Sequence, residues 1–208
     1  MMICCPKYHN LRDKMKTSQV KLFNPYAQFE TDNSLMYRTK TYLSYTCQRK
    51  RCVGVVIMVN PGSSIPKGEL HVVHEASEDK SLQIVNEVVS KAYNLKGIKP
   101  NDGDYIEIFN TFNLCKWPLH EAIKLFLKQK DSKYMFTPMN INSDTEWLWV
   151  AWGKDGGELT GIKEQIYNQL DKSKIIGIYE DGYYYHPLRI QIKGKKKYVT
   201  KQITNYLS

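Results

Sequence analysis

Val55-Val56-Ile57-Met58-Val59 runs directly into Asn60-Pro61-Gly62-Ser63-Ser64, and this stretch decides how the rest of the chain is interpreted. Five consecutive apolar residues predict a strand buried on both faces, as central strands of parallel sheets are. Three later apolar runs are also followed by polar residues: 105–109 by Asn110, 147–152 by Gly153-Lys154, and 175–179, after a short interval, by His186-Pro187-Leu188-Arg189.

Helical segments separate these runs. Residues 78–93 carry apolar side chains at helical spacing, Pro118 opens a second helix, and 158–170 predict a third. Alternating strands and helices predict an α/β protein, a three-layer sandwich with a central, mostly parallel sheet. Ligands of such sheets bind outside the carboxyl ends of the strands, so we expect the four polar endings to converge on one crevice.

The ends of the chain are less regular. Residues 1–34 are polar and predict an N-terminal arm or cover, while 35–53 predict one or two edge strands interrupted by a basic turn. In the basic C-terminal extension, 190–208, the alternation over 190–198 predicts a last edge strand and 200–207 predict a short helix. No linker divides the sequence, so we expect one domain over residues 1–208.

Composition narrows the class of partner. The formal net charge is +9, with a pI of about 9.2, which favours a polyanion such as DNA, although a lysine-rich surface also serves solubility alone. The 15 tyrosines and 4 tryptophans suit base stacking but also fill cores. Neither interpretation is excluded at this stage.

The sequence also predicts that the protein has no disulfides, membrane partner, metal or cofactor. The 5 cysteines lack paired spacing, which predicts reduced thiols in a cytoplasmic protein. No apolar run is long enough to cross a bilayer, so we expect no membrane partner. We also expect no metal, because His71 and His74 lack a clear ligand set, and no cofactor, because the turn after the first strand has no Walker lysine.

Taken together and in order, the strand endings resemble the uracil-DNA glycosylase superfamily. There the first strand ends in Gly-Gln-Asp-Pro-Tyr or Gly-Ile-Asn-Pro-Gly, later strands end in Asn and in Trp-Gly, and a His-Pro loop completes the site. The similar residues here are Val59-Asn60-Pro61-Gly62, Phe109-Asn110, Ala151-Trp152-Gly153 and His186-Pro187-Leu188. The match is closer to an uncharacterised bacterial family, the domain of unknown function 1643, which adds Asp79-Lys80-Ser81 and Asn110-Thr111-Phe112.

This resemblance implies a DNA glycosylase with a uracil-DNA-glycosylase-like fold, which acts on a base flipped out of duplex DNA or on a single strand. The implied catalytic residues are Asn60, His186 and Asp79. The implied base-binding residues are Pro61, Gly62, Asn110, Phe112 and Trp152. The implied DNA-binding residues are Ser63, Ser64, Lys154, Leu188 and Arg189. The substrate would be uracil, mismatched thymine or a bulky modified base of phage DNA, and the last would place the protein in antiviral defence.

Two other functions stay open. Asn60 stands where the most active branch has Asp, which also suits a module that binds nucleic acid or nucleotide in the same crevice without cleaving it. A hydrolase of free nucleosides is the third interpretation. Each motif also has a purely structural interpretation, because Asn-Pro-Gly turns, capped strand ends and isolated histidines are common in protein folds.

Overall fold

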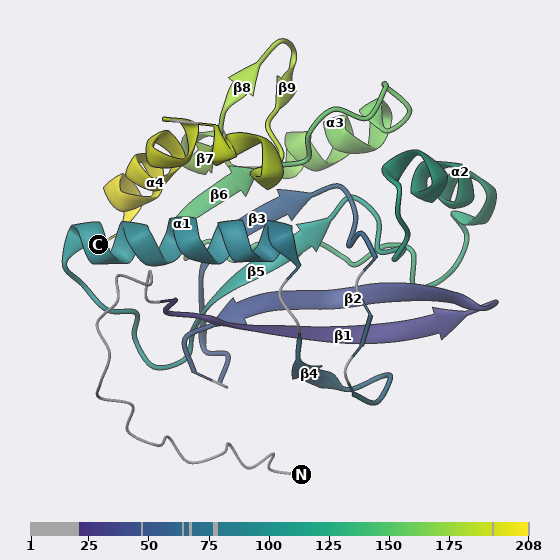
Figure 1. Cartoon of the computed structure of the whole chain (residues 1–208), viewed down its shortest axis with the longest axis horizontal. Helices are drawn as coiled ribbons and strands as arrows, with labels where there is room; N and C mark the ends of the chain where they lie inside the picture. Colours follow the sequence, from purple (N-terminus) through teal and green to yellow (C-terminus); the bar gives the residue numbers. More distant parts are fainter. Residues whose placement is uncertain are drawn as a thin grey trace.

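A seven-stranded sheet forms the centre of the molecule (Figure 1). The structure is a computed structural model that describes residues 21–46, 48–63, 65–66, 68–76, 79–192 and 194–207. The strands are β1 (Asn24–Asp32), β2 (Leu35–Ser44), β3 (Arg51–Met58), β4 (Val73–Glu75), β5 (Asp104–Asn110), β6 (Trp147–Val150), β7 (Ile175–Ile176), β8 (Tyr179–Glu180) and β9 (Tyr183–Tyr184). The helices are α1 (Lys80–Lys96), α2 (Leu119–Gln129), α3 (Thr160–Gln169) and α4 (Lys195–Tyr206), with short 3-10 helices η1 (Lys172–Lys174) and η2 (Pro187–Gln191).

The sheet is mixed, with a parallel half and an antiparallel half. Its strand order is β4-β1-β2-β5-β3-β6-β7, and β8 pairs only with β9. Strand β3 runs parallel to both β5 and β6, and β6 runs parallel to β7, whereas β2 pairs antiparallel with β5 and with β1. The predicted parallel strands are therefore present, but the sheet is mixed rather than mostly parallel. Of the antiparallel half, β2 lies in the segment expected to form edge strands, although it pairs on both sides, and β1 and β4 were not foreseen.

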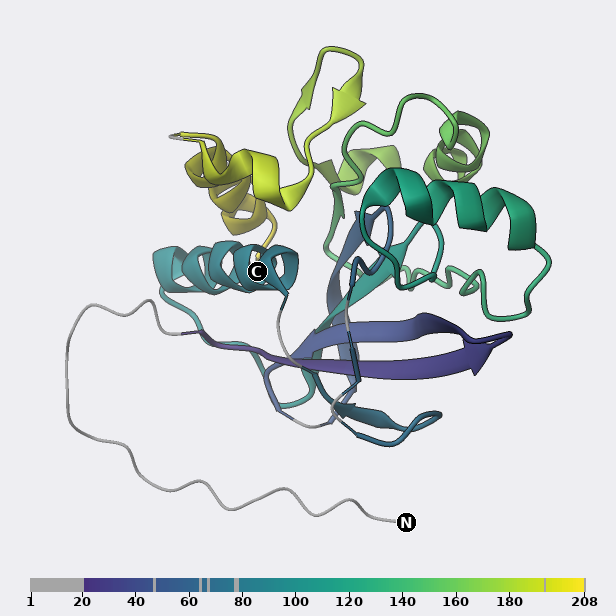
Figure 2. The same ribbon diagram turned by 45° about the vertical axis from the view of Figure 1, so that its right-hand side comes forward.

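Helices cover both faces of the parallel half, and Figure 2 shows α1 and α4 on one side of the sheet and α2 and α3 on the other. On the first face Val88 of α1 and Val199 of α4 are fully buried against Val56 and Met58 of β3. On the second face Ile123 of α2 belongs to a separate apolar cluster. The α/β class and its layers are thus as expected, because the continuous apolar runs are buried on both sides.

Helix α1 lies in the segment that the sequence predicts, 78–93, but begins at Lys80 and ends at Lys96. The side chain of Asp79 accepts a hydrogen bond from the backbone N–H of Leu82 at 2.9 Å, which satisfies one of the unpaired donors of the first turn. Gly97 ends the helix in the left-handed conformation, with φ of 74°, which glycine adopts without steric cost. The helix N-terminus is therefore fixed at Asp79, one of the candidate catalytic residues.

Two terminal predictions were wrong. Strand β1 lies inside the segment expected to be an irregular arm, because Ala27 and Phe29 alternate inward and pair with β2; residues 1–20 lie outside the described part of the chain. The edge strand expected over 190–198 is instead η2 followed by the start of α4. The helix forms because Val199 and Ile203, four residues apart, both bury against α1.

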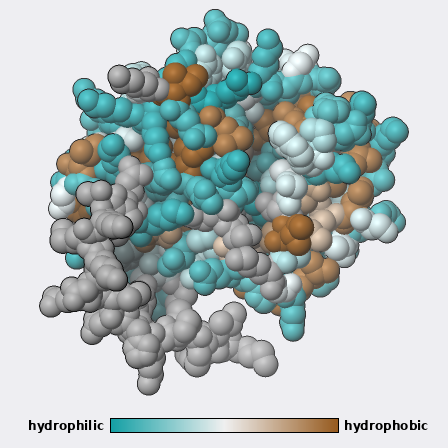
Figure 3. All heavy atoms as spheres, viewed as in Figure 1, coloured by the Kyte–Doolittle hydropathy of each residue, from teal (hydrophilic) through white to brown (hydrophobic). Residues whose placement is uncertain are grey.

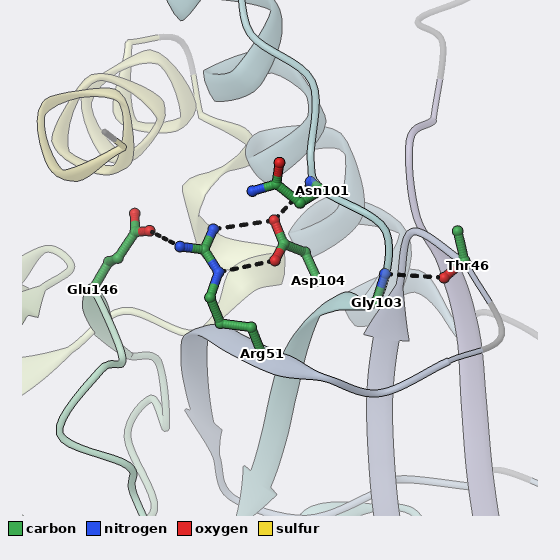
Figure 4. A network of polar contacts seen from close by, with 6 residues as sticks. All are labelled: Thr46, Arg51, Asn101, Gly103, Asp104 and Glu146. Atoms are coloured by element: carbon green, nitrogen blue, oxygen red, sulfur yellow. Dashed lines mark hydrogen bonds and ion pairs between the residues drawn. The ribbon is translucent and has the colours of Figure 1, made fainter.

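A polar network ties the amino ends of the parallel strands together (Figure 4). The guanidinium of Arg51 binds both carboxylate oxygens of Asp104, at 2.9 and 3.1 Å, and lies 3.5 Å from Glu146. The backbone N–H of Asn101 also donates to Asp104, at 2.8 Å. Because Asp104 is only 2% exposed, this network joins β3, β5 and the approach to β6 at the end of the sheet away from the candidate site.

Candidate functional site

The carboxyl ends of β3, β5 and β6 lie side by side. Met58 of β3 pairs with Asn110 of β5, and the backbone N–H of Ala151, directly after β6, donates to the carbonyl of Ile57 at 2.9 Å. Asn60, Asn110 and Gly153 therefore leave the sheet at one edge, as the sequence predicts. The N-terminus of α1 and the start of η2 approach the same edge, since η2 packs against α1 (Figure 1).

Asn60 braces a neighbouring loop. Its side-chain nitrogen donates to the backbone carbonyls of Lys116, at 3.0 Å, and Leu114, at 3.5 Å. Only the amide nitrogen can donate to a carbonyl, so these bonds fix the orientation of the side chain and leave its Oδ1 as the acceptor for a ligand or water. Pro61 is buried and Gly62 has φ of 66°, which completes the expected tight turn.

His186 is a neutral imidazole with one defined tautomer. It caps η2, where its Nδ1 accepts a hydrogen bond from the backbone N–H of Leu188 at 3.3 Å. The ring proton therefore resides on Nε2. Burial lowers the pKa of His186 from 6.5 to about 4, and this lowering outweighs the opposing effect of Asp79. At neutral pH the ring can thus donate through Nε2 without carrying a charge.

Gly153 allows the loop after β6 to approach His186. Its backbone N–H donates to the carbonyl of Tyr184 at 3.0 Å, which joins the two segments. Its φ is 70°, and a Cβ at this position would lie 3.0 Å from the Cβ of His186. The structure therefore brings two of the predicted strand endings, 152–153 and 186–188, into direct contact.

Asp79 links His186 to a buried arginine. One carboxylate oxygen of Asp79 caps α1, and the other lies 3.3 Å from Nη1 of Arg38, which is 1% exposed on β2. The negative charge of Asp79 also raises the pKa of His186, so the two groups interact electrostatically. Cys115 lies beside the same pair, and burial raises the pKa of its thiol to about 12. No sequence pattern singled out Arg38, because it is one of two cations in a strand of mixed composition.

The base-binding candidates differ in burial, and Asn110 lines a cavity together with Ile57 of β3 and Ile162 of α3. Asn110 has a buried Oδ1 with no hydrogen-bond partner among the residues that the structure describes, as expected of a group that awaits a ligand or water. Phe112 is completely buried and stacks on Phe126 with ring centroids 4.9 Å apart. Trp152 also belongs to the α2 and α3 face. The structure therefore does not bring Phe112 and Trp152 into the crevice, which differs from the sequence-based expectation.

The DNA-binding candidates lie at the surface. Ser63, Lys154 and Arg189 are exposed, Leu188 is 39% exposed, and Ser64 lies outside the described residues. Figure 3 shows a largely hydrophilic face in which hydrophobic side chains occur in scattered groups. Within the described ranges, no cluster of three metal-binding side chains is present and no helix is long and apolar enough to span a membrane.

Comparison with known proteins leaves the family open. A scan against protein-family models finds no match, and searches of curated proteins and of solved structures find none either. The α/β class and the mixed sheet are established by the structure itself. The glycosylase interpretation therefore depends on the order of the motifs and on the geometry described above.

Proposed function

We propose that this chain is a DNA glycosylase that hydrolyses the N-glycosidic bond of a flipped, damaged or modified base. One observation carries the proposal: His186 is a partly buried, neutral hydrogen-bond donor of fixed tautomer, held beside Asp79 at the carboxyl ends of the strands. A carboxyl-end edge is where α/β sheets bind ligands. A neutral donor at this place suits a reaction in which negative charge develops on a departing base.

The chemistry assigns a role to each polar group. Water oxygen bonds to the sugar C1′, the bond from C1′ to the base nitrogen breaks, and its electron pair leaves with the base. Nε2–H of His186 would stabilise that anion. Oδ1 of Asn60 would accept a hydrogen bond from the attacking water and position it, and Asp79 would take the proton that the water releases.

The substrate proposal is a bulky base, such as a modified base of phage DNA, which would give the protein a role in antiviral defence. A Cβ at Gly62 would meet nothing within 4 Å, so the turn after β3 leaves open space where a larger base would need it. The buried Oδ1 of Asn110 would accept a hydrogen bond from the base edge. Equal or better activity on plain uracil DNA would contradict this choice of substrate.

DNA contacts would come from the residues around η2. Leu188 is an exposed apolar side chain next to His186, as a wedge between bases requires. Arg189, Ser63 and Lys154 would bind phosphates, in keeping with the net charge of +9. Such contacts release counterions, so affinity should fall steeply with added salt. A flat salt response would exclude the nucleic-acid interpretation.

The test is a base-release assay. Purified protein is incubated with duplexes that carry uracil, mismatches, or hydroxymethylated and glucosylated cytosines, and alkali then cleaves any abasic site. We expect cleavage at one kind of base, and a loss of about 100-fold or more in His186→Ala and in Asn60→Ala. His120→Ala is the matched control, because His120 is an exposed histidine on α2.

A binding module without chemistry is the second candidate. It is favoured by Asn60, whose amide nitrogen is committed to the loop at Leu114 and Lys116 and whose side chain cannot act as a strong base. Binding without strand cleavage across the panel would establish this second function. Release of sugar from free nucleosides, with intact duplexes left uncut, would identify a nucleoside hydrolase instead.

A further inference from the structure

A second concave site lies beside the loop that follows β6. It is a cleft of about 560 Å³ between α3 and the β8–β9 hairpin, which projects from the molecule in Figures 1 and 2. Five aromatic side chains line it: Trp152, Tyr167, Tyr179, Tyr183 and Tyr184. None of the chemistry proposed for His186 uses this cleft.

The aromatic rings are arranged around Tyr184. Its ring centroid lies 5.0 Å from that of Tyr179, 6.1 Å from that of Trp152 and 6.2 Å from that of Tyr167. Tyr179 is 64% exposed, although it is a large ring on a two-residue strand. An exposed ring next to an ordered aromatic cluster provides a face on which a planar ligand can stack.

A buried lysine makes the wall of the cleft rigid. The amine of Lys163 donates to the carbonyl of Gly153 at 2.9 Å and lies 3.0 Å from a carboxylate oxygen of Asp155. It also lies 5.7 Å from the ring centroid of Trp152. Lys163 and Asp155 thus balance each other's charge, and the lysine fixes the loop that separates the cleft from the crevice.

Two lysines lie beside the aromatic rings of the cleft, while Glu164 lies in its lining; Lys172 also donates to the backbone carbonyl of Tyr167. The amine of Lys172 lies 3.4 Å from the ring centroid of Tyr167, and that of Lys154 lies 6.0 Å from the ring centroid of Tyr183. Aromatic rings inside with cations beside them suit a ligand that has a planar base and a phosphate.

We propose that this cleft binds an unpaired nucleobase of a nucleic-acid strand, with Tyr179 as the principal stacking residue. Lys154 and Lys172 would contact the adjoining phosphates. The backbone N–H of Gly153 bonds to Tyr184 O, and His186 follows Tyr184 by two residues, so one strand can occupy both cleft and crevice. This inference shares with the proposed function a nucleic-acid partner, but it does not require base release.

The experiment measures binding of a labelled oligothymidylate of about 12 nucleotides by fluorescence anisotropy. We expect Tyr179→Ala to weaken binding by about ten-fold, because stacking on one aromatic ring contributes about 1–3 kcal/mol. Tyr179→Trp retains a stacking ring and should restore affinity. Tyr198→Ala is the matched control, since Tyr198 is an exposed tyrosine on α4 and does not line the cleft.

Several outcomes would overturn the inference: no binding of the strand by the unmodified chain, an unchanged affinity in Tyr179→Ala, or an equal loss in Tyr198→Ala. Competition by glucose but not by thymidine monophosphate would assign the cleft to a sugar and also reject it. Base-release assays separate the two proposals. Binding that depends on Tyr179 without base release supports the cleft and removes the glycosylase. Base release together with binding that Tyr179→Ala does not weaken supports the glycosylase and rejects the cleft.

Discussion

Acid should destabilise the fold through His186. The pKa of this histidine is about 4 in the folded chain, against 6.5 for an unperturbed group. Between these two values the unfolded chain binds a proton that the folded chain does not, so the free energy of unfolding falls as the pH falls. The stabilisation is fully present above about pH 6.5 and is lost progressively down to about pH 4.

The size of the effect follows from the two pKa values. A difference of one pKa unit corresponds to about 1.36 kcal/mol, so protonation linked to His186 should remove about 2 kcal/mol by pH 5 and about 3 kcal/mol by pH 4. Residual exposure of the ring makes these values upper bounds. Typical domains are stable by about 5–15 kcal/mol, so the loss is large enough to measure.

Urea unfolding at pH 7, 5 and 4 tests this, with His186→Gln as the comparison. Glutamine does not titrate and can still accept the hydrogen bond from Leu188, while every other titrating group remains in both proteins. We expect the unmodified chain to lose about 2 kcal/mol more than His186→Gln between pH 7 and pH 5. His120→Gln should follow the unmodified chain. Parallel curves for the unmodified chain and His186→Gln would refute the reasoning, and with it the neutral donor on which the proposed mechanism depends.

Three further predictions concern stability and reactivity. In Gly54→Ala the new Cβ would lie 2.2 Å from ring atoms of the fully buried Trp147, so urea unfolding should show a loss of about 3 kcal/mol. Gly161→Ala, with open space around it, should cost nothing or stabilise slightly, and equal effects of the two substitutions would contradict this reasoning. Asp104→Ala leaves the arginine network without its carboxylate and should cost about 3 kcal/mol, measured in the same way, and a change below about 0.5 kcal/mol would show that the network is dispensable. The thiol of Cys115, with a pKa of about 12, should react with iodoacetamide much more slowly at pH 8 than a free thiol does, and mass spectrometry that finds it rapidly modified would show that its burial is wrong.

The parallel half of the fold was predictable from the sequence because its signals are local. Four or more apolar residues in a row predict a strand buried on both faces, and β3 and β6 follow this rule, whereas β5 is mainly apolar but interrupted by Glu107. In the antiparallel half β2 was predicted as a strand but β1 was not, because β1 contains polar residues at its outward positions and a proline near its start. Its strand character comes from pairing with β2 and β4, which are partners that no local pattern specifies.

The candidate site was predictable only where a polar residue directly follows a strand. Asn60 and Asn110 met this condition, whereas His186 lies several residues beyond the predicted strand 175–179 and was identified from the order of the motifs. Arg38 did not meet it, because its position near Asp79 arises when β2 pairs antiparallel with β5. Side chains alternate along a strand, so the sequence alone indicates that Trp152 shares a face with Leu148 and Val150.

The two outer strands of the sheet limit how the protein can aggregate. Strand β4 has three residues and β7 has two, and a long unpaired edge is the usual template on which another chain adds a strand. Strand β1, which would otherwise offer nine residues, is capped over its central part by β4, and the backbone N–H groups of His71 and Ala76 continue this cover on either side. These short borders leave little unpaired strand edge among the described residues, so a second chain finds few backbone groups on which a fibre could grow.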